Sequence, residues 1–385
     1  MANLSTHFFH ETPDSLAQWC ADRRQPAFRA KQIFEWVYRK GVIDPLAMTN
    51  LPGGLREALA AEMSFLTGET IAHQRASDGT QKLLIAWDRE GKDEETSRSL
   101  PIAGQPVATG WETECVMIPS LDDTERGYPK RRTACISSQV GCPVGCRFCA
   151  SGLEGLDGNL SAGRIVEQVW RLDRILMEQW EDQPDAPDRG ITNIVFMGMG
   201  EPLANFGNVV QAVRTLVADW GMNIGARKIT ISTVGMHKAI ERLADDLDLP
   251  VTLALSLHAP NDNLRRELIP WAEFTTIEQL FAACARWFEK TGREITLEYT
   301  LLDDVNDRPE HAQELAVVAK RLRANVNLIR FNEVDAVPFG RPKDQRVRAF
   351  QTALADRGVN VHIRASRGRD IAAACGQLRH EQAAS

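Results

Sequence analysis

The chain has 385 residues, enough for one large domain and a smaller one, and its 43% hydrophobic and 25% charged residues are typical of a globular protein. It contains no run of about 18 apolar residues that would cross a membrane. The net charge of −7 argues against sequence-independent binding of nucleic acid, but it leaves room for a structured RNA held by local basic runs.

Residues 1–68 form the first predicted unit, and their pattern is helical. Apolar side chains such as Ile33 and Val37 share one side of a predicted helix that ends before Gly41, and a second helix follows the Pro-Gly-Gly break at 52–54. The first residues lack a basic region followed by an apolar stretch, so we expect a cytoplasmic protein.

Residues 69–118 form the second predicted unit, a short β extension or linker. Two runs read as strands, at 81–87 and 112–119, and a loop rich in glycine, proline, serine and charged residues separates them at about 88–110.

Residues 119–378 form the largest predicted unit, in which strands and helices alternate, and residues 379–385 are a tail. Ile165, Val169, Leu172 and Leu176 mark one face of a predicted helix. Six or seven such βα units predict an α/β fold, a partial (β/α)6-type barrel with helices outside a parallel sheet. The predicted strands lie at 133–140, 191–198, 228–235, 251–258, 295–302, 326–331 and 359–365.

Polar and reactive residues follow these strands at the points where the strands end. Glu201 and Asn332 follow two different strands, Ser232 ends the run "KITIS", and His258 stands at the end of the strand at 251–258. A loop with three cysteines follows the strand that begins near residue 133. Because the carboxyl ends of parallel strands meet at one rim of a barrel, we expect these residues to surround one active site.

The cysteine loop contains Cys142, Cys146 and Cys149, while Cys135 stands upstream on the predicted strand. In a reducing cytosol, clustered cysteines are more often metal ligands or catalysts than disulfides. A structural zinc site requires four protein ligands, whereas three cysteines can hold a 4Fe–4S cluster and leave one iron open. This spacing, with Phe148 before the last cysteine, is the signature of the radical S-adenosylmethionine (SAM) superfamily; zinc remains the alternative.

The run "GMGEP" at 198–202 is suited to the rest of SAM. Gly198 and Gly200 allow the backbone to approach a ligand closely, and Glu201 can accept hydrogen bonds from the SAM ammonium group.

Longer motifs extend the likeness along most of the chain. From about residue 28 to residue 378 the chain resembles the RlmN/Cfr family of radical SAM RNA adenosine methyltransferases, and its RlmN branch most of all. The motifs that carry this resemblance are "CISSQVGC" at 135–142, "NLSAGRIVEQVWR" at 159–171, "ITNIVFMGMGEPLAN" at 191–205, "KITISTVG" at 228–235, "ALSLHAPND" at 254–262, "ITLEYTLLDDVND" at 295–307 and "SRGRDIAAACGQL" at 366–378.

The resemblance implies an activity and its partners. Enzymes of the RlmN branch methylate carbon 2 of one adenosine in large-subunit (23S) ribosomal RNA, near the peptidyl transferase centre. They commonly also methylate the adenosine 3′ of the anticodon in some transfer RNAs. The helical unit at 1–68 would help to hold the RNA. An external electron donor and a disulfide reductant would serve the enzyme, and no membrane is involved.

The resemblance also implies a role for individual residues. Cys375 would carry the methyl group, Cys135 would resolve the covalent intermediate, and Glu114 would accept a proton. The cluster ligands would be Cys142, Cys146 and Cys149. The SAM contacts would be Gly200, Glu201, Ser232, Ser256, Leu257, His258 and Asn332.

Other interpretations stay open at this point. One is a Cfr-type enzyme that methylates carbon 8 of adenosine, and another is an RNA-modifying relative with a different RNA target. A radical SAM enzyme acting on a peptide would not be expected to carry the pair Cys135 and Cys375. A non-catalytic RNA-binding relative would be expected to lack Cys375 or a cluster cysteine, and all of these are present.

Overall fold

The protein is built around one ten-stranded sheet. The computed structural model describes residues 6–88, 111–121, 123–183, 185–334 and 337–378; the predicted loop at 88–110, apart from its first residue, and the predicted tail at 379–385 lie outside these ranges. The strand order is β16-β15-β14-β13-β12-β11-β8-β5-β4-β3. Among the described residues β16 and β3 are the two edges, so the sheet curls without closing.

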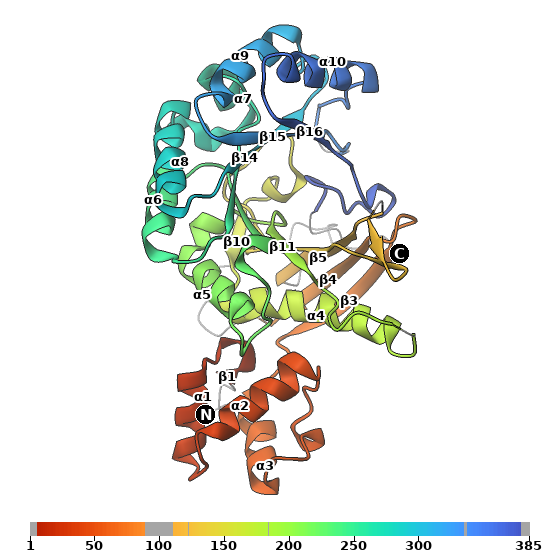
Figure 1. Ribbon diagram of the computed structural model, residues 1–385, viewed down its shortest axis with the longest axis vertical. Helices are drawn as coiled ribbons and strands as arrows, with labels where there is room; N and C mark the ends of the chain where they lie inside the picture. Colours follow the sequence, from red (N-terminus) through yellow and green to blue (C-terminus); the bar gives the residue numbers. More distant parts are fainter. Residues whose placement is uncertain (1–5, 89–110, 122, 184, 335–336, 379–385) are drawn as a thin grey trace, which may run out of the picture.

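Seven neighbouring strands run parallel and form the barrel part of the sheet. Helices cover their outer face (Figure 1). The strands are β8 (Arg132–Cys135), β11 (Asn193–Phe196), β12 (Ile229–Thr233), β13 (Thr252–Ser256), β14 (Ile295–Leu301), β15 (Ala324–Arg330) and β16 (Val361–Arg364). The helices are α4 (Ala162–Trp180), α5 (Phe206–Val217), α6 (His237–Asp246), α7 (Asp262–Leu268), α8 (Ile277–Thr291), α9 (Pro309–Ala319) and α10 (Asp344–Ala355). The predicted fold class, an α/β protein with a partial barrel, is confirmed.

The helices start and stop where local chemistry requires. At the start of α8 the Thr276 hydroxyl accepts the backbone N–H of Gln279, and Gly292 ends the helix in the left-handed conformation. The buried face of α8 includes Trp287, which is fully enclosed. None of the helices in the described ranges is both long enough and apolar enough to span a bilayer.

The β extension continues the same sheet through three antiparallel strands, β5 (Trp111–Pro119), β4 (Gln81–Trp87) and β3 (Gly68–Arg75). The sequence predicted β4 and β5 but not β3. Most β3 side chains are exposed, and the strand contains no apolar alternation from which it could be recognised.

The predicted strand at 133–140 is divided into two. β8 ends at Cys135, and β9 (Gln139–Gly141) turns away to pair with β10 (Leu156–Asn159). The backbone N–H of Ser138 donates to the Met199 carbonyl, which bends the chain between the two strands. This break lets the cysteine loop lie across the end of the barrel instead of extending beyond it.

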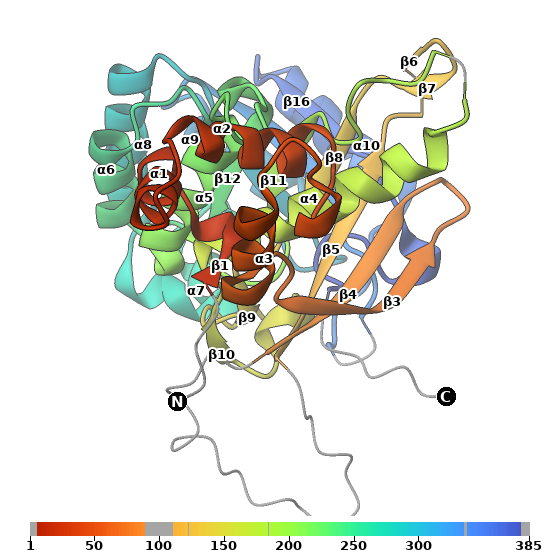
Figure 2. The same cartoon turned by 90° about the horizontal axis from the view of Figure 1, so that it is seen from below.

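The N-terminal lobe contains the helices predicted at 1–68 and lies against α4 (Figure 2). Its elements are β1 (Thr6–His7), η1 (Phe8–His10), α1 (Pro13–Asp22), α2 (Phe28–Phe34), the π-helical turn η2 (Glu35–Arg39), η3 (Pro45–Ala47), α3 (Gly53–Glu62) and β2 (Met63–Ser64). Apolar contact joins the lobe to the barrel, since the rings of Phe9 and Trp170 lie 5.9 Å apart.

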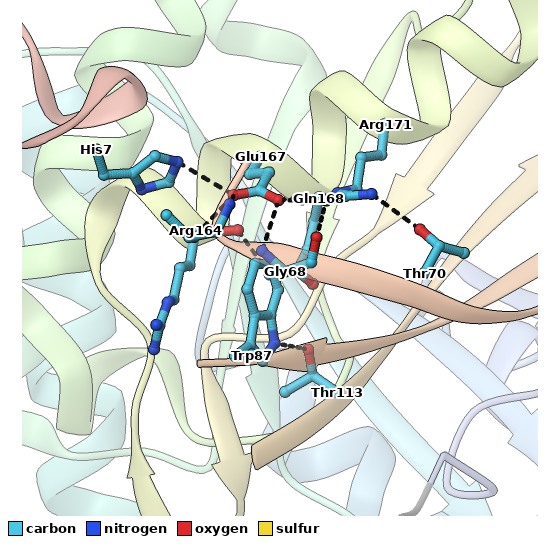
Figure 3. A network of polar contacts seen from close by, with 10 residues as sticks. His7, Gly68, Thr70, Trp87, Thr113, Arg164, Glu167, Gln168 and Arg171 are labelled. Atoms are coloured by element: carbon cyan, nitrogen blue, oxygen red, sulfur yellow. Dashed lines mark hydrogen bonds and ion pairs between the residues drawn. The ribbon is translucent and has the colours of Figure 1, made fainter. Parts of the chain in front are cut away.

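A buried carboxylate on α4, that of Glu167, fastens the lobe and the β extension together (Figure 3). Its Oε2 atom lies 3.1 Å from Nε2 of His7 and accepts the backbone N–H of Thr67 at 3.0 Å, while Oε1 accepts from Arg171. Burial would raise the pKa of Glu167, but the His7 contact and the charge of Arg171 outweigh burial and lower it. The carboxylate therefore stays ionised at neutral pH and connects three parts of the chain.

Candidate active site

A cavity lies at the carboxyl ends of the parallel strands, where the sequence predicted the active site. Most of the predicted site residues reach it from different strands, as expected for side chains that follow parallel strands. The predicted residues that line the cavity are Cys142, Cys146, Cys149, Gly200, Glu201, Ser232, Ser256, His258 and Cys375.

The cysteine loop is held from several sides. The N–H of Cys142 donates to the Gly155 carbonyl at 2.7 Å, and the N–H of Arg147 donates to the Leu268 carbonyl at 3.0 Å. Gly141 has φ +74°, and a Cβ atom there would meet the Gly155 carbonyl oxygen at 2.1 Å, so this turn requires glycine. These contacts hold the three cysteines against one wall of the cavity.

Burial raises the pKa of all three loop thiols. The pKa of Cys142 rises to about 12, that of Cys149 rises, and that of Cys146 rises well above its usual range, with the neighbouring cysteines adding to the effect. The raised pKa values favour the protonated thiols, so a metal centre that takes thiolate ligands would have to displace three protons on binding.

The three thiols are compatible with an iron–sulfur cluster. Within the described ranges, no three Cys, His, Asp or Glu side chains converge on a point that one metal ion could occupy. A 4Fe–4S cluster makes a different demand, because each of its protein ligands binds a separate iron. The three cysteines line the same cavity and fit such a cluster. Residues from the other strand ends line the rest of the cavity, which leaves room for a second ligand.

Glu201 lies between β11 and the 3-10 helix η5 (Pro202–Asn205). Its carboxylate accepts the N–H of Leu203 at 2.9 Å through Oε1 and the N–H of Val234 at 2.7 Å through Oε2. Burial nevertheless raises the pKa of Glu201 to about 6. The carboxylate is thus fixed in direction by two backbone donors, and Glu201 lines the cavity.

The next two strand ends contribute hydroxyl groups and an imidazole. The Ser232 and Ser256 hydroxyl oxygens lie 3.2 Å apart. His258 has φ +56°, and its Nδ1 accepts the Thr300 backbone N–H at 3.0 Å. Burial lowers the pKa of His258 to about 3, so the ring is neutral at physiological pH and its tautomer is set by that hydrogen bond.

Two of the predicted SAM contacts, Leu257 and Asn332, are not among the residues that line this cavity. The Leu257 side chain is fully buried, and Leu257 is absent from the lining of the cavity, so contact would have to come from its backbone. Asn332 borders a smaller neighbouring pocket, where its amide donates to the Cys375 carbonyl at 3.1 Å. In this structure Asn332 therefore holds the backbone of Cys375.

Cys135 and Cys375 come from distant parts of the chain, and Cys135 packs with Ala373 and Leu378, which lie on either side of Cys375 in the sequence. Cys135 is the buried last residue of β8, and Cys375 lines the cavity. Burial raises the pKa of Cys135 to about 12; the charge of Cys375 adds to this, while Arg364 opposes it. Cys135 thus lies against the segment that carries Cys375, the cysteine with which the resemblance pairs it.

Glu114 lies on β5 and does not belong to the lining of the cavity. Its carboxylate forms a buried ion pair with Lys82, with 2.6 Å between Oε1 and Nζ. Its backbone carbonyl accepts the Ser137 hydroxyl at 2.6 Å, just before the bend that leads to the cysteine loop.

The sequence did not predict two charged residues of the cavity, Glu298 and Arg364, or a third outside it, Lys82, which pairs with Glu114. Glu298 and Arg364 line the cavity, and the charges of Cys375 and Glu298 raise the pKa of Arg364. Each stands within a predicted strand at a position expected to be apolar or to face solvent. A charged residue inside a buried parallel strand is a usable signal, because burying it without partners is costly.

Family models match two parts of the chain. Residues 136–316 match the Radical SAM superfamily, and residues 8–64 match the ribosomal RNA large subunit methyltransferase N-terminal domain.

Whole-chain relatives agree with these matches. A protein of Salinibacter ruber named "Probable dual-specificity RNA methyltransferase RlmN" is 40% identical over 95% of this chain and 92% of its own. A Thermosynechococcus vestitus protein with the same name is 42% identical over 95% and 96%. Among solved structures, a radical SAM methyltransferase from Sphaerobacter thermophilus superposes with a TM-score of 0.85 at 41% identity, covering 98% of this chain and 100% of that one.

Proposed function

The chain belongs to the RlmN family of radical SAM RNA methyltransferases, and we propose that it methylates carbon 2 of a specific adenosine in 23S ribosomal RNA and an adenosine in transfer RNA. The observation that carries this proposal is the packing of Cys135 against the Cys375 segment, beside the cavity that Cys375 and the three-cysteine loop line. The names of the relatives, which describe dual-specificity RNA methyltransferases, support two kinds of RNA substrate.

The superfamily uses a 4Fe–4S cluster and SAM. In the proposal Cys142, Cys146 and Cys149 hold the cluster, and the remaining strand ends hold SAM. When bound, the two supply the methyl group and the radical chemistry. The proposed SAM contacts are Gly200, Glu201, Ser232, Ser256, Leu257, His258 and Asn332, of which Leu257 would contribute its backbone.

The chain's own residues carry the methyl group to RNA. Carbon 2 of adenine has no nucleophilic lone pair, so direct transfer of a methyl cation is not available. The thiolate of Cys375 is a suitable nucleophile to accept a methyl group first and then present its carbon to adenine. Cys375 would thereby become linked to the RNA through one carbon atom.

Release of the RNA falls to Cys135 and Glu114. A base must take the former C2 proton, and the proposed acceptor is Glu114. The Sγ atoms of Cys135 and Cys375 then join, while the electron pair of the carbon–sulfur bond stays with the RNA carbon. That carbon takes up a proton and becomes the methyl group. An external disulfide reductant restores both thiols, and an external electron donor starts each radical turnover.

The organisation of the chain fits a large structured substrate. We propose units at 1–68, 69–118 and 119–378, with the first helping to grip RNA. Its surface offers Lys40 stacked 3.7 Å from the ring centre of Trp36, and an exposed Phe28 beside Arg29. Cations beside aromatic rings suit phosphates and unstacked bases. With ribosomal and transfer RNA as substrates, the cytoplasm is the proposed location.

The test is mass mapping of modified adenosines in ribosomal and transfer RNA from cells with and without the gene. We expect 2-methyladenosine to disappear without the gene and to return with the wild-type gene but not with Cys375→Ala. If 8-methyladenosine is the product instead, the enzyme acts like the Cfr branch and the C2 proposal is wrong.

A further inference from the structure

The turn between β3 and β4 touches the segment that leads to Cys375. The carboxylate of Asp78 accepts the backbone N–H of Gly368 at 3.0 Å, and the carboxylate of Asp370 accepts the backbone N–H of Ser77 at 2.9 Å. Each segment thus gives a carboxylate to the other's backbone. Figure 1 shows the dark-blue chain after β16 beside the orange hairpin of β3 and β4.

The two carboxylate oxygens of Asp78 accept hydrogen bonds from different parts of the chain. Its Oδ1 accepts the N–H of Thr80 at 3.0 Å, which shapes the turn, and its Oδ2 accepts the N–H of Gly368. Burial would raise the pKa of Asp78, but these hydrogen bonds and the charge of Arg367 lower it overall, so the carboxylate is ionised under working conditions. Hydrogen bonds to an ionised acceptor are the stronger kind.

The two segments also fit closely in space. Gly368 has φ +65°, and a Cβ atom there would meet Thr80 Cγ2 at 2.8 Å. The Ala373 N–H donates back to the Gly368 carbonyl at 2.8 Å, so the docked residue Gly368 begins a compact loop that ends two residues before Cys375. The position of Gly368 therefore limits the position of Cys375.

Lys82, the second residue of β4, makes a third link between the hairpin and the segment that leads to Cys375. Its ammonium group donates to the Ala372 carbonyl at 3.4 Å and pairs with Glu114 at 2.6 Å. Ala372 has φ +48°, a conformation that a non-glycine residue seldom adopts without support. Lys82 thus joins the proposed proton acceptor to the loop that carries the proposed methyl carrier.

We propose that Asp78 and Lys82 are positioning residues for Cys375, which clamp the segment Gly368–Ala372 to the β3–β4 hairpin. The inference rests on the proposed role of Cys375 as methyl carrier. That thiol has to meet a methyl donor, adenine and Cys135 in turn, and a short docked loop keeps its effective concentration at each of them high. The hairpin lies outside the cavity, so its contribution is to geometry and not to chemistry.

The first experiment measures docking without any turnover. Asp78→Asn keeps the size of the side chain but turns an amide N–H₂ toward one of two backbone donors. Losing a hydrogen bond to a charged acceptor corresponds to roughly tenfold to hundredfold in the docking equilibrium. We expect hydrogen exchange in peptides covering 366–378 to accelerate at least about tenfold, while peptides from β14 and β15 stay unchanged. The matched control is Asp123→Asn, which breaks an exposed ion pair with Lys130 and should change neither region.

The second experiment follows methylation of Cys375 by intact-protein and peptide mass spectrometry under single-turnover conditions. Asp78→Asn should slow the appearance of S-methylcysteine about tenfold at saturating SAM and leave the half-saturating SAM concentration within about twofold. Lys82→Met should slow it comparably, and Lys82→Arg, which keeps a cation at that position, should restore most of the rate. A merely structural role would lower thermal stability equally in both Lys82 variants and would show no such rescue.

The outcomes separate the two proposals. If the wild-type enzyme modifies RNA without ever methylating Cys375, the proposed function fails. If the wild-type enzyme methylates Cys375 and Asp78→Asn matches it in both exchange and rate, the clamp is refuted while the function stands. Exchange that accelerates throughout the barrel in Asp78→Asn would also refute the clamp, because it would show general destabilisation.

Discussion

Two cysteine-bearing loops reach the same cavity, and they are held in different ways. The loop with Cys142, Cys146 and Cys149 follows directly from β8 and β9 and is fixed by hydrogen bonds to Gly155 and Leu268. The loop that ends with Cys375 follows β16 and contains the short 3-10 helix η8 (Arg369–Ile371). It is held by hydrogen bonds to three separate places, which are the β3–β4 hairpin, Asn332 after β15, and the cysteine loop. The last of these bonds runs from the Ala150 N–H to the Gly376 carbonyl at 2.8 Å.

The difference matches the roles proposed for the two loops. A cluster requires ligands at fixed separations, which a tightly turned loop on rigid strands provides. A methyl carrier has to change partners, and an attachment made of separate polar contacts can adjust by losing one of them. Cys135 stands between the two, on the strand that feeds the first loop and against the hydrophobic side of the second, where it packs with Ala373 and Leu378.

The largest expected effect comes from breaking the first loop. Cys146→Ala removes one of three proposed cluster ligands, and we expect anaerobically reconstituted protein to lose bound iron and sulfide and to cleave no SAM. Iron and sulfide analysis measures this directly. The control is Cys284→Ala, a buried cysteine on α8 away from the cavity, which should cost roughly 1 kcal/mol of stability and keep a full cluster. Stoichiometric zinc without sulfide in protein purified without air would contradict the prediction.

The second prediction addresses the residue that lies between the loops. Cys135→Ala leaves Cys375 and the cluster ligands in place, so attachment to RNA should proceed and release should fail. We expect RNA to remain covalently bound to the protein as a shifted, nuclease-sensitive band on a denaturing gel. The band should be missing from Cys135→Ala/Cys375→Ala.

A matched control for this prediction is Cys115→Ala. Cys115 is equally buried and lies on the neighbouring strand β5, where burial also raises the pKa of its thiol. Its replacement should reduce stability by roughly 1 kcal/mol and trap no RNA. Free, fully methylated RNA from Cys135→Ala would show that a second thiol is not needed for release.

The two loops also differ in how far the sequence alone could predict them. The three cysteines follow one another at fixed spacing, and the strand–helix alternation predicted the rim on which they lie. Glu201 and His258 could be placed there for the same reason, because each follows a strand of a parallel sheet. Local spacing and strand order were sufficient for this part of the cavity.

The surroundings of Cys375 could not be predicted in the same way. Its holders Asp78 and Lys82 precede it by almost 300 residues, and β3, which supports their hairpin, has exposed polar side chains and no alternating pattern. Glu298 was not singled out in the sequence, and Arg364 was read only as part of a basic run near the C-terminus, yet both line the cavity. A contact that depends on which strands become neighbours leaves no periodic trace in the sequence, so the partners of Cys375 and of Glu114 emerged from the three-dimensional structure.

The smallest expected effect is the response of the second loop to pH. Asp78 and Asp370 both have a lowered pKa, since their hydrogen bonds to backbone N–H groups, aided at Asp78 by Arg367, outweigh burial. A carboxyl whose pKa is lower in the folded protein contributes stability that is fully present above its unfolded pKa of about 3.9 and is lost as the pH falls through the lower folded value. Both carboxylates therefore stay ionised from pH 6 to pH 8.

Hydrogen exchange in 366–378, corrected for the intrinsic pH dependence of exchange, should be constant over that range and accelerate below about pH 4. A steady acceleration between pH 8 and pH 6 would contradict this prediction, because it would mean that a group with a near-neutral pKa holds the loop in place of these aspartates.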